Sequence, residues 1–104
     1  MIAKPPSELV LLQAHELAER IRLRQVSCRE VMQTYLAHIE HYNPLVNALV
    51  SLQPAEALLA EADRRDAELA RGEYRGWMHG LPHAIKDLSL THGIRTTLGS
   101  PLYR

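Results

Sequence analysis

The sequence predicts an α/β chain in which a helical part precedes a part made of loops and short strands. Residues 8–72 are rich in Leu, Ala, Glu, Arg and Gln, which favour helices, and they contain only two prolines. Residues 73–104 hold four of the five glycines and a Thr-Thr pair, a composition typical of turns and short strands. The whole chain has 104 residues, which is room for one small domain at most.

Two helices are expected in the first half of the chain. Apolar residues recur at helical spacing over residues 13–24, which predicts the first helix. Ser27 is followed three residues later by Glu30, a capping-box pattern that opens the second helix. We expect that helix to end at Asn43-Pro44, because the residue before a proline disfavours the helical conformation.

A buried strand and a third helix are expected next. Residues 45–52 form a short apolar run between turn signals, so we interpret them as a strand. Pro54 suits the first turn of a helix, and Gly72 stands where a C-terminal cap glycine is common. The third helix is therefore predicted between these two residues.

Charge and composition exclude some functional classes. Twelve basic and twelve acidic residues give a formal net charge of zero, whereas a nucleic-acid-binding protein usually carries a basic excess. No apolar run is long enough for a signal peptide or a membrane span. A single cysteine cannot form an internal disulfide, which favours a reducing compartment. We therefore expect a cytoplasmic protein without a nucleic-acid or membrane partner.

Neither the histidines nor the cysteine make a convincing site. His38 and His41 fit a solvated helix face, while His79 and His83 are separated by a glycine and a proline, so helical ligand spacing does not apply to them. Cys28 has no base near it in the sequence and is interpreted as structural. The sequence therefore predicts no metal and no cofactor.

Lys86 is the candidate catalytic residue. It follows Ala84-Ile85 in what we interpret as a short buried strand. A buried lysine tends to become neutral, and a neutral amine can act as a general base. The simpler alternative is a surface lysine paired with Asp87.

The stretch around Lys86 resembles the amidase signature family. The resemblance is carried by the run His-Gly-Leu-Pro-His-Ala-Ile-Lys-Asp at residues 79–87 and by Gly93, Thr96-Thr97 and Gly99-Ser100. Softer agreement extends upstream to about residue 12. The resemblance implies helices packed on a mixed sheet and hydrolysis of carboxylic amides by a Ser–cis-Ser–Lys triad. Within that triad it implies that Lys86 is the base.

The same resemblance implies that the chain holds only part of the family's machinery. Both family serines lie in a Gly/Ser-rich block far downstream of the lysine, whereas eighteen residues follow Lys86 here. We therefore expect residues 1–104 to be the N-terminal fragment of an amidase domain that lacks its C-terminal segment and is inactive alone. The intact parent would act on a small-molecule amide.

Two alternatives remain open. The parent could be the A subunit of an amidotransferase, which carries the same triad and works beside partner subunits. The chain could also be a non-catalytic helical remnant that binds a partner through its apolar stripes.

Overall fold

The computed structural model describes residues 7–87 and 89–103, and its regular structure is helical. The α-helices are α1 (Glu8–Leu11), α2 (Ala14–Arg22), α3 (Cys28–Val46) and α4 (Ala55–Ala70), and a short 3-10 helix follows at Pro101–Tyr103. Within the described residues there is no strand, only an isolated antiparallel bridge between Thr91 and Ile94. The helical half of the predicted α/β class is confirmed, and the mixed sheet is not.

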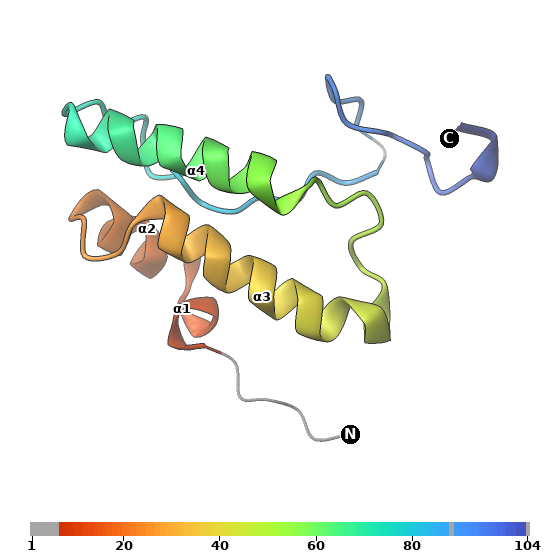
Figure 1. The fold of residues 1–104 in the computed structure, drawn as a ribbon, viewed down its shortest axis with the longest axis horizontal. Coiled ribbons are helices and arrows are strands. Elements are labelled where there is room, and N and C mark those ends of the chain that lie inside the picture. Colours follow the sequence, from red (N-terminus) through yellow and green to blue (C-terminus); the bar gives the residue numbers. More distant parts are fainter. Residues whose placement is uncertain (1–6, 88, 104) are drawn as a thin grey trace.

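Two long antiparallel helices form the frame of the molecule (Figure 1). α3 and α4 lie side by side, and α1 packs against α3. The buried apolar side chains lie near the start of α3, where α2 joins the helix pair: Leu17, Ala18, Ile21, Cys28, Val31 and Ala62. The chain after α4 runs back along the helix pair, and its last residues lie beyond the far end of α4.

The start of α3 is fixed by two side chains. The predicted cap is confirmed, because the backbone N–H of Glu30 donates to the Ser27 hydroxyl at 2.9 Å. Asp66 of α4 adds a second cap, and its two carboxylate oxygens accept from the backbone N–H groups of Cys28 and Arg29 at 2.7 and 3.1 Å. A carboxylate is favourable here because it satisfies unpaired N–H groups and meets the positive end of the helix dipole.

The prediction that α3 ends at Asn43-Pro44 is wrong, because the helix continues to Val46 with Pro44 inside it. A proline so near the end removes only one hydrogen bond of the last turn. The end is set instead by two asparagines: the Asn43 side chain both donates to and accepts from the backbone of Leu49 at 2.9 Å, and Asn47 takes the left-handed conformation.

The predicted strand over residues 45–52 is also wrong. Leu45 and Val46 belong to α3 and are exposed, and residues 47–53 have no regular structure. An isolated strand is not stable without a neighbouring strand to pair with, and the helix pair offers none.

The third predicted helix is confirmed, with Pro54 immediately before its first residue and Gly72 just beyond its end. Gly72 has a φ of +82°, the left-handed geometry in which glycine is favoured. No helix among the described residues is long and apolar enough to cross a membrane.

Candidate active site

The segment that carries Lys86 is fixed to the helices at Gly80. Gly80 has a φ of +74°, and a Cβ built on it would lie 2.3 Å from the Cys28 Sγ. Only glycine can bring the backbone this close to a buried side chain at that φ. Leu81 then packs against the edge of the core, so the lysine segment (residues 81–87 and 89–103) starts from a defined point.

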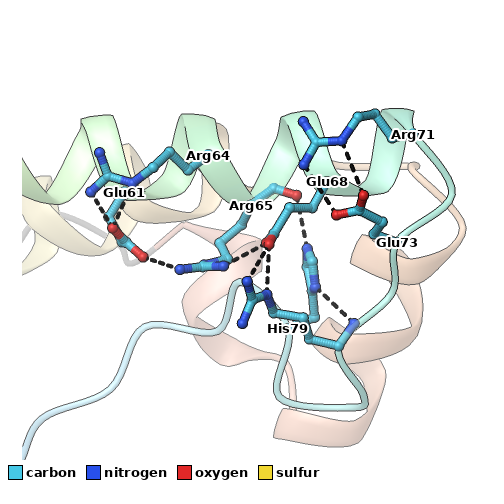
Figure 2. A network of polar contacts seen from close by, with 8 residues as sticks. Glu61, Arg64, Arg65, Glu68, Arg71, Glu73 and His79 are labelled. Atoms are coloured by element: carbon cyan, nitrogen blue, oxygen red, sulfur yellow. Dashed lines mark hydrogen bonds and ion pairs between the residues drawn. The ribbon is translucent and has the colours of Figure 1, made fainter.

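His79 adds a polar anchor beside that contact (Figure 2). Its side chain is 4% exposed, Nε2 lies 2.8 Å from the Arg65 carbonyl oxygen, and Nδ1 lies 3.1 Å from the Arg75 backbone nitrogen. These partners assign the neutral tautomer in which Nε2–H donates and Nδ1 accepts. The sequence pattern did not assign His79 to any site, and in the structure it joins the turn at residues 75–79 to α4.

Glu68 is the buried acid of the same network. It is 5% exposed and accepts from Arg75 Nε at 2.7 Å and from Arg65 Nη1 at 2.5 Å. These hydrogen bonds, that from Arg75 above all, lower the pKa of Glu68 to about 2, although burial acts in the opposite direction. Glu61 and Arg64 extend the network along α4, and Arg71 and Glu73 form a separate ion pair just after the helix. The network therefore holds the turn before Gly80 against α4.

Lys86 lies on the wall of an open groove of about 680 Å³. The groove is bounded by α3, the connection at residues 48–53, Leu58 of α4, and residues 82–87, 89, 91 and 94–96 of the lysine segment. Its apolar floor includes Met32, Tyr35 and Ile39 of α3. A concave surface beside a lysine is the kind of place where ligand sites form.

The predicted buried strand around Lys86 is not formed. Residues 81–86 have no regular structure, and Lys86 is exposed. The physical reason is that no strand lies beside this segment within the described residues, so nothing pairs with it or covers it. The burial that would make the amine a base is therefore absent in this structure.

Asp87 does not pair with Lys86 as the simpler alternative predicted. Within residues 7–87 and 89–103 no ion pair joins the two side chains, and the Asp87 carboxylate instead accepts from the Thr97 backbone N–H at 2.8 Å and from the Thr97 hydroxyl at 2.5 Å. These hydrogen bonds from Thr97, helped by the backbone of the turn that follows it, lower the pKa of Asp87.

The structure supports a structural role for Cys28. Its side chain is fully buried, and burial, followed by the effect of Asp66, raises the pKa of the thiol to about 12. A nucleophilic cysteine needs the opposite shift. Within the part of the chain that the structure describes, no three His, Cys, Asp or Glu side chains gather as metal ligands would.

A family model described as amidase matches residues 30–104. The chain belongs to the amidase family. The match begins in α3 and includes Lys86, so the candidate site lies inside the family's region. No solved structure gives a significant match to this amidase-family chain.

Curated relatives include two kinds of protein. The chain is 44% identical over 96 residues to the A subunit of the glutamyl-tRNA(Gln) amidotransferase of Cutibacterium acnes, covering 92% of this chain and 19% of that protein. It is 38% identical over 93 residues to the putative amidase AmiD of Mycobacterium tuberculosis, covering 89% of this chain and 19% of that protein. The chain thus spans about a fifth of the length of these relatives.

Proposed function

We propose that this chain supplies the catalytic base, Lys86, to an amidase-family enzyme that hydrolyses carboxylic amides. The observation that carries the proposal is the position of Lys86, which lies within the family match and on the wall of the groove. We further propose that residues 1–104 are part of a longer cytoplasmic protein, since they cover 19% of these relatives.

In the proposed mechanism the lysine accepts a proton in its neutral form. A serine attacks the amide carbonyl carbon, a bridging cis-serine takes the proton from the nucleophile, and Lys86 takes the proton from the bridging serine. As the C–N bond breaks, that proton passes to the leaving amine nitrogen, and water then hydrolyses the acyl-serine. Both serines belong to the part of the protein beyond residue 104. Lys86 is exposed here, so the proposal also requires that this further part cover the groove, because burial favours the neutral amine.

The apolar side chains around the groove fit such a covering. Val50, Ile85 and Ile94 remain 38–61% exposed on or beside its walls, and exposed apolar surface of this kind usually marks a contact with another protein surface. A non-catalytic interaction module, the alternative interpretation, would bind its partner through the same exposed apolar side chains.

A chimera tests the function directly. The matching segment of the Cutibacterium acnes amidotransferase or of the Mycobacterium tuberculosis amidase would be replaced by this chain, and amide hydrolysis would be compared with that of the unaltered relative. We expect the chimera to be active and Lys86→Ala to reduce kcat at least about 10²-fold, because general-base catalysis typically contributes about 10²–10⁴-fold. Lys86→Arg keeps the charge but cannot supply a neutral base at ordinary pH, so it should fail equally.

Controls separate the proposal from its alternatives. Arg22→Ala, an exposed position on α2, should leave the chimera active. The isolated chain should show no hydrolysis, and turnover by it that survives Lys86→Ala would refute the assignment. Reading the coding sequence beyond Arg104 is the simplest check, since a Gly-Ser-Ser-Gly-type block there supports the proposal.

The second candidate is the A subunit of an amidotransferase, and the 44% identity to the Cutibacterium acnes protein favours it. The two chimeras distinguish the candidates. If this chain comes from an amidotransferase, the amidotransferase chimera should be active when the partner subunits of that enzyme are present. If it comes from an amidase, only the amidase chimera should be active.

A further inference from the structure

The Asp87 carboxylate is the centre of a closed loop. Besides the two hydrogen bonds from Thr97, it accepts a longer one from the Gly99 backbone N–H at 3.4 Å. Leu98 and Gly99 have φ values of +55° and +77°, so successive N–H groups of this turn face one anion, as in other anion-binding turns of backbone N–H groups. The carboxylate thus joins two points of the chain ten to twelve residues apart.

Further bonds tighten the loop on the Lys86 side. The Ser89 backbone N–H donates to the Lys86 carbonyl oxygen at 3.0 Å, and the Thr96 hydroxyl donates to the Ser89 carbonyl oxygen at 3.4 Å. The backbone of Lys86 is therefore bonded within the same loop that Asp87 closes. The preceding anchor, at Gly80, is six residues away.

We propose that Asp87 is a positioning residue. Its bonds to Thr97 fix the Lys86 loop and hold its own carboxylate away from the lysine amine. The proposal rests on the proposed base function of Lys86. The contact between Asp87 and Thr97 has two physical effects. It orders the loop, and it gives the carboxylate next to Lys86 in sequence hydrogen-bond donors other than the lysine. A carboxylate that paired with Lys86 would favour the charged ammonium, which cannot accept a proton.

Few other titratable groups line the groove with Lys86. Those that line it with the lysine are Tyr35 of α3 and His83, Asp87 and Arg95 of the lysine segment, while α4 and the 48–53 connection contribute uncharged side chains. Asp87 is the acid in this set, so releasing its carboxylate from Thr97 would leave a negative charge free to approach Lys86.

The test is a pair of substitutions at Thr97 in the active chimera. Thr97→Val removes the hydroxyl donor at nearly constant volume, and Thr97→Ser keeps it. We expect Thr97→Val to lower kcat at least tenfold and to move the acid limb of the kcat/KM profile to higher pH by at least half a unit. Thr97→Ser should stay within threefold of the parent with an unmoved limb. A structural role alone would not shift the profile.

Asp87→Asn separates the two effects. It should lower kcat, since the loop loses its anion, but its acid limb should not move upward, because no carboxylate is released. Equal upward shifts in Thr97→Val and Asp87→Asn, or no shift in Thr97→Val, would overturn the proposal.

Two measurements keep the outcomes distinct. If Lys86→Ala leaves the chimera active, the proposed function fails, whereas a Lys86-dependent chimera with an unaltered Thr97→Val profile sinks only the positioning role. If Thr97→Val does not fold, hydrogen exchange of the Thr97 and Gly99 amides in the isolated chain decides. The proposal requires at least tenfold faster exchange in Asp87→Asn than in the parent, and equal rates would overturn it.

Discussion

The helical region and the lysine segment are stabilised in different ways. Every buried side chain of the described residues lies between Leu17 and His79, in the helices or the turn after α4. Within residues 81–87 and 89–102 the lysine segment buries none, and Leu90 and Leu102 in it are 88% and 89% exposed. The helices are held by apolar packing and buried polar contacts, whereas the lysine segment is held by Gly80 at its start and by Asp87 within it. The first region carries its own core, and the second is shaped by local hydrogen bonds and needs a further surface for burial.

The largest difference should come from truncating one isoleucine in the core. Ile21 is fully buried, so Ile21→Ala should lower the free energy of unfolding by about 2–5 kcal/mol, through lost burial and the cavity that remains. Leu90→Ala, in the lysine segment, should change it by less than about 0.5 kcal/mol. Urea denaturation followed by circular dichroism measures both. Comparable losses would mean that the two regions share one core, which would contradict the difference in burial described above.

A smaller effect is expected where the two regions meet. Gly80→Ala adds a methyl group against the Cys28 Sγ at a positive φ, and the strain together with the clash should cost about 2–4 kcal/mol. Gly93→Ala is the matched control, because Gly93 has a φ of +77° but no atom within 4 Å of the added Cβ. It should cost about 1–2 kcal/mol.

The double variant Gly80→Ala with Cys28→Ala sharpens this prediction. Removing the sulfur should recover part of the loss, but not all, since the Cys28 Cβ would still lie 3.1 Å from the new methyl group. Additive effects of the two substitutions would show that the contact does not fix the segment.

The cap at the start of α3 should contribute less. Asp66→Ala removes the acceptor of two backbone N–H groups and should cost about 1–2 kcal/mol, the upper part of the range of about 0.5–2 kcal/mol for other helix caps. Asp63 lies on α4 like Asp66 and forms an exposed ion pair with Arg29 of α3. Asp63→Ala, which removes this ion pair, should cost under about 1 kcal/mol. Thermal unfolding of both variants gives the comparison, and equal losses would contradict the capping role.

Acid should weaken the network around His79, and at neutral pH this effect should be the smallest of the series. The pKa of Glu68 is lowered from 4.5 to about 2, so the folded state binds this proton less readily than the unfolded state does. Its contribution is complete above about pH 4.5 and is lost as the pH falls toward 2. Glu68→Gln should reduce the steepness of acid unfolding in that window, and an unchanged slope would show that Glu68 is not held as the structure has it.

Local signals predicted the helices well and their ends less well. Ser27, Pro54 and Gly72 act through contacts within a few residues, so they could be recognised from the sequence alone. The end of α3 was predicted wrongly because the side-chain bonds from Asn43 to Leu49 outweigh the proline rule. The strand predictions at residues 45–52 and around Lys86 were wrong for one reason: a strand depends on a partner strand, and the described chain supplies none.

The candidate site was predictable in its central residue but not in its surroundings. The motif indicated Lys86, although the expected burial is absent. The bonds of Asp87 to Thr97, ten residues away, and of His79 to Arg65, fourteen away, have no local periodicity that would reveal them. One signal was present: His79 precedes a glycine whose conformation requires a tightly packed turn, and a buried histidine needs partners for both ring nitrogens.

The packing of Gly80 on Cys28 also limits where Lys86, the base that we propose, can lie. Lys86 lies six residues after Gly80, and an extended chain advances at most about 3.3–3.6 Å per residue, so the Lys86 backbone stays within about 22 Å of that fixed point. Gly80 is therefore a fixed point, and the next six residues connect Lys86 to it. In the proposed mechanism, the bridging serine that passes its proton to Lys86 must therefore come to a lysine whose backbone is tied to the start of α3.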